Sequence, residues 1–361
     1  MPLVWKDDSS YPLNAAYMSR PINVRSGLAS KYLEANTAGN GVVLKANTII
    51  PLKSGSVWKA YLFESDVNVT DLDTGTLTLG TNYYVYLCDD GSDNGLLVIS
   101  ANSTAPSGFT ADNSRKIGGF HFGRRRNSIT VSDVTSNVVV PNSVWDLCHR
   151  PRCSPEGMVY IGNGVWVDIY LASVDEPITF SAGNGSPILT GSCKSAFNAL
   201  PLTGTEGLNG YNFIELARRS GKRLLTLAEW LQAAHGSPQG NNGDNINAWT
   251  ATSNTGRQYT GYVTYAISLL NVVDCVGNVW EWLDEFIVRW DGGNTGWAWR
   301  NVMSGQNVGQ LHMYADYSLV QVIAGGGWIN GVYAGSRCVS LRHYPWDVDS
   351  RLGSRFACDS L

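Results

Sequence analysis

Between residues 42 and 122 the sequence alternates short apolar runs with clusters of Gly, Asn, Asp and Ser, a pattern that few folds accommodate. The runs include Thr76–Leu79, Tyr83–Cys88 and Lys116–Phe122. Runs of this length bounded by turn residues are typical of β-strands, and a series of them is typical of antiparallel sandwiches. We therefore expect a β-sandwich domain over residues 42–144, with Lys116–Phe122 as its last strand.

The composition indicates globular domains and argues against several classes of partner. The chain has 361 residues, of which 43% are hydrophobic and 16% are charged, so it can bury more than one apolar core. Its net charge of −4 argues against nucleic acid and anionic membranes as partners. No uninterrupted apolar run approaches the roughly 18 residues of a membrane span, so we expect no membrane insertion. Acidic residues follow the N-terminus too closely for a signal peptide.

Residues 145–361 form a second region with a different composition. Eleven of the thirteen tryptophans lie in it. Many loops combined with abundant Trp predict an irregular fold that is held together by aromatic packing. Two helices are expected within this region. One spans residues 212–220 and ends at Gly221, and the other begins at Thr226, which forms a capping box with Glu229.

Several aromatic and guanidinium side chains of this region are expected to form its structural frame. Trp280 and Trp282 follow a Gly-Asn turn and are two residues apart, so both project from one face of a strand into the core. The other residues that we assign to structure carry an indole or a guanidinium group, and are Trp230, Trp328, Arg337 and Arg355. Arginines in such positions form buried ion pairs or bond to carbonyl oxygens.

The C-terminal segment predicts a surface whose side chains can change without disturbing the core. If residues 327–334 form a strand, the period of two buries Trp328 and Val332 and exposes Ile329 and Tyr333.

The same argument applies to residues 346–352. It turns Trp346 and Val348 inward, and it turns Asp347, Asp349 and Arg351 toward solvent.

The sequence does not predict a catalytic or metal centre. The seven cysteines contain no CxxC pair, so we expect buried thiols, with Cys338 and Cys358 as the one candidate bridge. No two histidines lie at metal-ligand spacing. Asp274, Glu281 and Asp284 are candidates for a carboxylate cluster, but the sequence does not establish the number of oxygen ligands that a structural Ca²⁺ ion needs. We therefore expect no cofactor.

A set of segments, in this order, resembles the sulfatase-modifying-factor family, which includes formylglycine-generating enzymes. The segments are Gly221–Trp230, Cys275–Trp282 and Gly325–Trp328, followed by Gly-Ser-Arg motifs at 335–337 and 353–355. The resemblance implies a variant of the C-type lectin fold. Together with the preceding strands it predicts an α+β, multi-domain chain, in which a β-sandwich is followed by a C-type lectin fold of the sulfatase-modifying-factor type.

The enzymes of that family suggest an oxidase as one alternative function. They bind copper and substrate through two cysteines, and alignment on Gly-Gly-x-Trp places Asn330 and Gly335 at those positions. Neither residue can ligate Cu(I), so we expect that the chain is not an enzyme. The Glu-Pro-Asn, Gln-Pro-Asp and Trp-Asn-Asp motifs of calcium-dependent sugar lectins are also missing.

The sandwich and the join that follows it also resemble the phage tropism-determinant family, whose members are receptor-binding proteins diversified by a retroelement. The similar segments are 86–91, 116–121 and 145–170. The resemblance implies a homotrimer at the virion tail tip that binds a host cell-surface receptor and other phage tail proteins. The resemblance covers roughly residue 42 to the end, and we expect residues 1–41 to form an N-terminal, β-rich oligomerisation segment. A variable binding protein displayed on a bacterial surface remains an alternative, and the receptor can be a protein or a glycan.

The same resemblance implies a variable region over about residues 325–358. The positions within it that are expected to bind the ligand are Gly327, Ile329, Gly331, Tyr333, Ser340, Arg342, His343, Asp347, Asp349, Arg351 and Leu352. They combine an aromatic ring, guanidinium groups, carboxylates and aliphatic groups, a mixture suited to protein binding.

Overall fold

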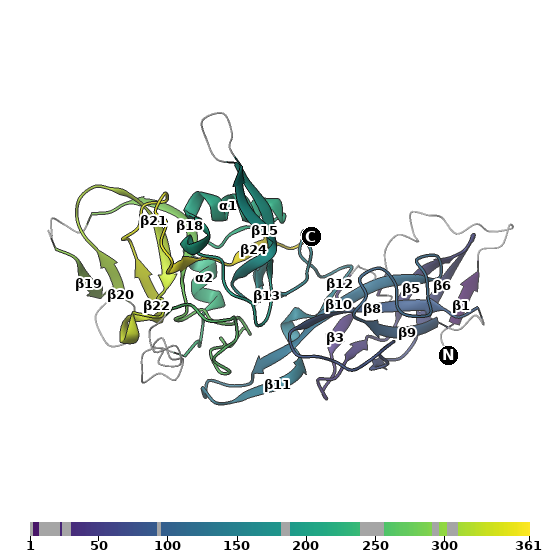
Figure 1. The fold of residues 1–361 in the computed structure, drawn as a ribbon. Helices are drawn as coiled ribbons and strands as arrows, with labels where there is room; N and C mark the ends of the chain where they lie inside the picture. The colour runs from purple at the N-terminus through teal and green to yellow at the C-terminus, as the bar shows by residue number, and fades with distance from the viewer. Residues whose placement is uncertain are drawn as a thin grey trace. The chain divides into compact units, whose positions relative to one another are not determined.

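The structure is a computed structural model, and it describes residues 3–6, 22–23, 30–91, 95–181, 188–238, 256–290, 296–301 and 310–361. Strands account for most of the regular structure, and the described residues form two compact units (Figure 1). Unit 1 comprises residues 1–125, 136–151 and 360–361, and unit 2 comprises residues 126–135 and 152–359. Within the described ranges, no helix is both long enough and apolar enough to cross a membrane.

Among the described residues of unit 1, the regular structure is almost entirely β-strand. Its elements are β1 Leu3–Lys6, β2 Ile22–Asn23, β3 Leu33–Ala35, β4 Val42–Leu44, β5 Thr48–Ser54, β6 Val57–Phe63, β7 Val67–Val69, β8 Thr81–Asp89, β9 Gly95–Ser100, β10 Ser114–Arg126, β11 Val134–Val139, the 3₁₀-helix η1 Pro141–Ser143 and β12 Trp145–Asp146. They form sheets with the orders β1-β6-β5-β2, β3-β4-β7 and β11-β10-β8-β9, and β12 pairs with β10.

One apolar core joins the sheets of unit 1. Side chains from each sheet contribute to it, including Leu33, Tyr61 and Phe120, which are at most 2% exposed. Alternate residues of a strand share a face, so Tyr83, Val85 and Leu87 of β8 all enter this core. Asp146 fixes the start of β3, since its Oδ2 accepts the amides of Tyr32 and Leu33 at 2.6 and 3.1 Å.

Unit 1 differs from the sequence expectation in four places. Residues 76–79 form no strand, and Lys116–Phe122 is not in the last strand because β11 and β12 follow β10. Residues 1–41 and 42–144, expected as separate domains, fall in the same unit, since β1 pairs with β6. Residues 145–151 also belong to this unit, because β12 pairs with β10.

The described residues of unit 2 form strands and two α-helices. Its elements are β13 Met158–Gly162, β14 Val165–Asp168, β15 Ala172–Ser181, β16 Ile188–Ser195, η2 Gly204–Glu206, α1 Gly210–Arg219, β17 Arg223–Leu224, α2 Leu227–Ala233, β18 Trp280–Val288, β19 Ala298–Asn301, β20 Gln310–Met313, β21 Leu319–Gly325, η4 Gly331–Tyr333, β22 Gly335–Ser340, β23 Leu352–Gly353 and β24 Phe356–Asp359. The sheets have the orders β13-β14-β24-β17, β15-β16 and β19-β20-β22-β21-β18-β23.

Both predicted helices are present, with the expected stop of the first and the expected N-cap of the second. Helix α1 is followed by Gly221 at a φ of +70°, a conformation that favours glycine. Helix α2 has Thr226 as its N-cap, and Thr226 and Glu229 form the predicted capping box. The N-terminus of α1 lies two residues before the predicted start, because Asn209 caps it by accepting the amide of Asn212.

The predicted tryptophan frame lies in the interior of unit 2. Trp230 and Trp282 are at most 1% exposed, and Trp280 and Trp328 are 6% and 8% exposed. Trp280 and Trp282 belong to one core cluster, as expected for residues two apart on a strand.

Arg355 is the ionic centre of this frame. Its side chain donates to the carboxylate of Glu281 at 2.6 and 2.9 Å, and it also donates to the carbonyl oxygens of Ile169 and Val273. Arg337 differs from Arg355 in that its side chain is exposed, and its assignment to the frame stays a prediction.

Candidate functional site

The segment between β21 and β22 carries the first group of predicted ligand-binding positions. It is not the predicted strand, because residues 328–333 form a turn followed by the 3₁₀-helix η4. The turn is fixed by the amide of Gly327, which donates to Asn330 Oδ1 at 2.8 Å, and by the amide of Trp328, which donates to the carbonyl of Asn278 at 3.0 Å.

The predicted burial holds at several positions of this segment although the geometry differs. Trp328 is buried, whereas Ile329 and Tyr333 are each 46% exposed. Gly331 is half-buried and Gly327 is buried. The prediction for Val332 concerns a side chain outside the described residues.

The stretch from Arg342 to Leu352 also departs from the strand pattern. The chain reverses at Tyr344–Asp347, where the amide of Asp347 donates to the carbonyl of Tyr344 at 3.0 Å. A turn has no period of two, so Trp346 and Val348 are each 54% exposed and the prediction that they point inward is wrong. Asp347 is half-buried, and its Oδ2 accepts the amide of Tyr344 and lies 3.1 Å from Nδ1 of His343.

Asp349 and Arg351 form an ion pair within this stretch. Arg351 Nε donates to Asp349 Oδ1 at 2.9 Å, and this hydrogen bond, with the positive charge, lowers the pKa of Asp349 to about 2. Both side chains are half-buried, so the pair is only partly available to a ligand.

Three predicted ligand-binding positions are buried, which corrects their assignment to the exposed surface. They are Gly327 and the core residues Ser340 and Leu352. Ser340 is 2% exposed because it lies in β22, between β20 and β21. Leu352 is 1% exposed and packs in the same core cluster as Trp280 and Trp282. Neither side chain can contact a ligand without a rearrangement of the sheet.

A ladder of stacked rings connects Tyr333 to the frame. Trp299 stacks on Tyr333 with ring centres 5.1 Å apart and an angle of 3°, and it stacks on Trp280 at 6.5 Å. His312 lies opposite Trp299 in the β19–β20 pair, with ring centres 4.7 Å apart. Burial is the main cause that lowers the pKa of His312, so the ring is neutral at pH 7. Tyr333 is therefore held against rings that lie on fixed strands.

Trp297 extends this ladder toward solvent. It lies two residues before Trp299, stacks on His312 at 5.1 Å and is 45% exposed. The guanidinium carbons of Arg289 and Arg342 lie 4.7 and 6.0 Å from its ring centre. These distances are in the range of cation–π interactions.

Arg289 also fixes the backbone beneath Arg342. Its Nη1 donates to the carbonyl oxygens of Leu341 and Arg342 at 2.9 and 3.1 Å, and its Nε donates to Asp316 at 2.7 Å. The hydrogen bonds from Arg289 lower the pKa of Asp316, so this pair remains charged at neutral pH.

A second group of rings lies beside the first. Trp290 and Tyr317 stack with centres 4.2 Å apart, and they are 48% and 66% exposed. Tyr344 stacks on Trp346 at 5.2 Å, and its hydroxyl lies 3.4 Å from Ser318 Oγ, one residue after Tyr317.

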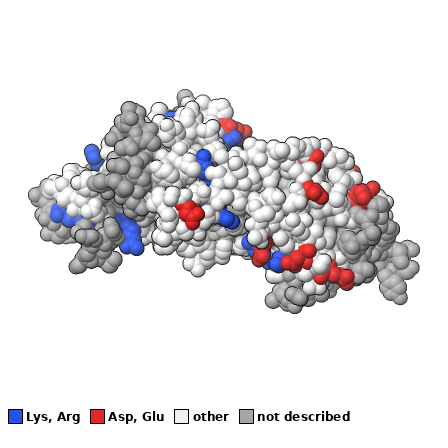
Figure 2. Space-filling view, turned by 90° about the horizontal axis from the view of Figure 1, so that it is seen from below, with Lys and Arg blue, Asp and Glu red and all other residues white. Residues whose placement is uncertain are grey.

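We call the two groups together the aromatic surface, which consists of Trp290, Trp297, Trp299, His312, Tyr317, Tyr333, Tyr344, Trp346 and the exposed Arg342. Arg289 is buried and supports this surface from beneath. On the face of the molecule drawn in Figure 2, basic side chains and no acidic ones are coloured at the end on the left of the view. Stacked rings with guanidinium groups are the composition of protein-binding hot spots.

Most of the aromatic surface was missed from the sequence. The signal that could have revealed it is Trp297-Ala298-Trp299, which repeats the two-residue spacing of Trp280 and Trp282. Spacing alone does not distinguish an exposed face of a strand from a buried one, since the distinction depends on what packs over the strand.

Two metal sites were considered from the sequence, the copper site of an oxidase and a carboxylate cluster for Ca²⁺. In the described residues, neither site has a cluster of metal ligands. Asn330 and Gly335 occupy the turn and the start of β22, and the Asn330 side chain is bonded to the backbone. Glu281 pairs with Arg355, and Asp284 is exposed, so the expected carboxylate cluster does not form. Within the described ranges, no three His, Cys, Asp or Glu side chains are placed to hold a metal ion.

Most of the chain is similar to known proteins and protein domains. The Mtd second domain matches residues 32–146, and the sulfatase-modifying factor enzyme 1-like domain matches residues 190–360. The tail fiber receptor-binding protein of Bordetella phage BPP-1 is 28% identical over 328 residues, an alignment that covers 88% of this chain and 79% of that protein.

Solved structures give the same result for the fold. The M1 and I1 variants of the Major Tropism Determinant match with TM-scores of 0.71 and 0.69 at 23% and 24% identity, and each match covers 97% of this chain and 89% of the other. The chain therefore has the fold of the Major Tropism Determinant, and the resemblance expected from its sequence is confirmed.

Proposed function

We propose that this chain is a phage receptor-binding protein that recognises a host cell-surface receptor through the aromatic surface of unit 2. The observation that carries the proposal is the stacking of half-exposed Tyr333 on Trp299, which joins a predicted variable position to a fixed frame. The similarity to the tail fiber receptor-binding protein of Bordetella phage BPP-1 supports the same function.

The mechanism is equilibrium binding by a preorganised surface. Rings that already stack on one another lose little conformational freedom on binding, so more of the contact energy appears as affinity. Arg289 adds to this by holding the backbone of Leu341 and Arg342 in place. Specificity then depends on the exposed side chains that differ among variants.

The predicted variable positions divide by exposure. Ile329, Tyr333 and Arg342 are exposed, and they are the strongest candidates for direct receptor contacts. Half-buried positions are expected to tune the shape of the surface, and they are Gly331, His343, Asp347, Asp349 and Arg351. Diversification of these positions by a retroelement is part of the proposal, and a near-copy of the last coding segment beside a reverse-transcriptase gene would support it.

The remaining parts of the proposal concern the fold type and the assembly. Unit 2 is a C-type lectin fold of the sulfatase-modifying-factor type, which the domain match over residues 190–360 supports. The protein acts as a homotrimer at the virion tail tip and contacts other tail proteins, so several weak contacts on one particle add through avidity. It works without a cofactor and is not an enzyme, since neither Asn330 nor Gly335 can supply a thiolate.

A binding experiment with one pair of variants tests the function. Purified protein is expected to bind host cells and to block adsorption of the phage. Replacing Tyr333 with Ala should weaken binding at least about 30-fold, because hot-spot aromatics contribute about 2 kcal/mol or more. Tyr211→Ala is the matched control, since Tyr211 is 48% exposed and also stacks on one ring, that of Phe286, outside the aromatic surface.

Two results would contradict the proposal. One is equal binding by the Tyr333→Ala and Tyr211→Ala variants at unchanged thermal stability. The other is copper-dependent oxidation of a cysteine-containing peptide by the purified protein, which would favour the oxidase.

A further inference from the structure

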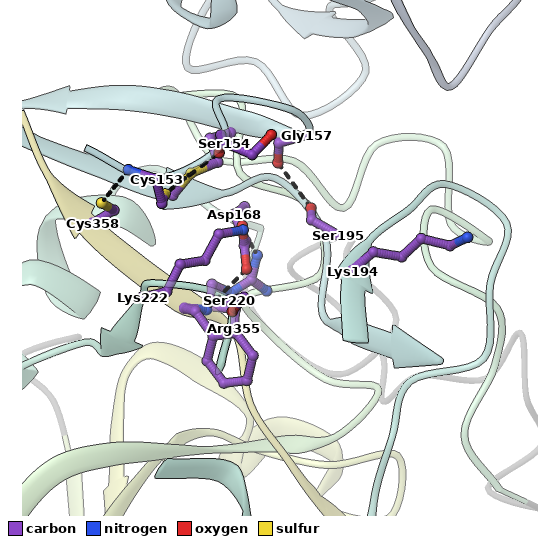
Figure 3. Close-up of polar contacts among 12 residues, drawn as sticks. Cys153, Ser154, Gly157, Asp168, Lys194, Ser195, Ser220, Lys222, Arg355 and Cys358 are labelled. Atoms are coloured by element: carbon purple, nitrogen blue, oxygen red, sulfur yellow. Dashed lines mark hydrogen bonds and ion pairs between the residues drawn. The ribbon is translucent and has the colours of Figure 1, made fainter. Parts of the chain in front are cut away.

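Cys153 and Cys358 lie opposite one another on two antiparallel segments. Pro151 and Ser360 form an antiparallel bridge, and the amide of Arg152 donates to the carbonyl of Asp359 at 2.9 Å. Continuing this register by one residue sets Cys153 against Cys358. The amide of Cys153 donates to Cys358 Sγ at 3.3 Å, which confirms the approach of the two residues (Figure 3).

This arrangement satisfies the distance requirement of a disulfide. Opposed residues on antiparallel strands have Cα atoms about 4.5–5.5 Å apart. Disulfides join Cα atoms that are about 4.4–6.8 Å apart, so the backbone does not need to move. No disulfide joins any of the seven cysteines in the structure, all of which lie within the described residues.

The pair expected from the sequence was different. Cys338 lies in β22, opposite Gln310 of β20, and it packs in the core cluster of unit 2. Cys358 lies in β24, opposite Trp166 of β14. The two cysteines therefore belong to different sheets, and the partner beside Cys358 is Cys153.

The surroundings of the pair combine access with a nearby positive charge. Cys153 is half-buried, so a small oxidant can reach it, whereas Cys358 is 5% exposed. Lys222 lies next to the pair and donates to Asp168 at 2.6 Å (Figure 3). Its charge favours the thiolate of Cys153, although burial has the larger effect and raises the pKa of this thiol.

We propose that Cys153 and Cys358 form a disulfide bond once the protein has left the reducing cytoplasm. This timing rests on the proposed function, since a virion protein is assembled inside the cell and then works outside it. The oxidant is a low-molecular-weight disulfide such as oxidised glutathione. The thiolate of Cys153 displaces one glutathione, the thiolate of Cys358 then displaces the second, and two reduced glutathione molecules carry away the two electrons and two protons.

The bond would close a long loop around the ligand-binding unit. The two residues are 205 positions apart, and they stand next to the first and last residues of the 152–359 segment. A crosslink across so long a loop removes much of the freedom of the unfolded chain. The disulfide would therefore stabilise the folded state of unit 2, and it would not contact the aromatic surface.

Mass spectrometry of the full-length protein tests the bond directly. The reduced protein is incubated with oxidised glutathione at pH 7 and at pH 8.5, remaining thiols are alkylated, and peptides are mapped. We expect a mass decrease of two hydrogen atoms, a crosslinked peptide containing Cys153 and Cys358, and faster formation at pH 8.5 because more Cys153 is thiolate. Seven alkylated cysteines after oxidation, or a crosslink between Cys338 and Cys358, would overturn the proposal.

Thermal unfolding with and without a reductant tests the consequence. Oxidised protein should unfold at least about 5 °C above reduced protein. The Cys153→Ser variant should lose this difference, and Cys338→Ser should keep it. An equal difference in both variants would also overturn the proposal. Receptor binding is expected to be the same in oxidised and reduced protein, so failure to bind in both forms would count against the proposed function and not against the disulfide.

Discussion

At the scale of single residues, the two Gly-Ser-Arg motifs show how far local sequence determines a side chain's role. Both predicted a structural arginine, yet Arg355 is 1% exposed and Arg337 is exposed. The difference lies in what the chain brings opposite each motif. Gly353 pairs with Glu281 of β18, which supplies a carboxylate for Arg355. That partner lies more than 70 positions away, so the motif alone could not reveal it.

Replacing Arg355 with Met should therefore destabilise the protein strongly. Glu281 would remain as a buried charge without its guanidinium partner, which costs about 3–5 kcal/mol. Denaturant unfolding should show this loss for Arg355→Met and a clearly smaller loss for the control Arg337→Met, whose side chain is exposed. The double variant Arg355→Met with Glu281→Leu should recover much of the stability, because no charge remains buried. Equal losses in both single variants would contradict this account of the frame.

At the scale of elements, prediction succeeded where the signal was local. The Thr226–Glu229 capping box and the stop at Gly221 fixed helix ends correctly, because each acts within one turn of helix. It failed for residues 327–334, where contacts from Asn278 hold a turn in place of a strand. Periodicity still sorted buried from exposed residues there, since Trp328 anchors the turn in the core.

The turn that carries Tyr333 depends on a close approach between its two ends. Gly326 has a φ of +88°, and a Cβ atom added there would lie 2.6 Å from Cβ of Ala334. Gly326→Ala should cost about 1–3 kcal/mol and weaken receptor binding, because both the backbone and the ends of the turn must shift. Gly164 is the matched control, since it has a φ of +77° in open space, and Gly164→Ala should cost about 1 kcal/mol without affecting binding. Unfolding and binding assays on both variants check this, and equal binding by both would show that the turn does not position the surface.

At the scale of the whole molecule, stability and recognition depend on different residues. The frame consists of buried groups such as Trp282 and the Arg355–Glu281 pair, whereas the aromatic surface lies on β19, β20 and the segments that connect the strands from β18 to β23. The sequence predicted the frame well, since abundant tryptophans and apolar runs are intrinsic to it. It predicted the surface only in part, because exposure of Trp297 or Trp346 depends on which strands remain uncovered after folding.

This separation predicts the result of exchanging the C-terminal segment between variants. Residues 327–351 are replaced by those of another variant, with Ser340 kept because it is buried in β22 and with Leu352 left in the core. Binding should follow the donor's receptor, and the unfolding temperature should change by less than about 3 °C, since surface substitutions usually alter stability by about 0.5 kcal/mol or less. A second exchange that also replaces Ser340 and Leu352 with larger residues is the control, and it should lower the unfolding temperature. Loss of stability in the first exchange would show that the positions described as exposed contribute to the core. Binding to the original receptor would show that another part of the chain recognises the receptor.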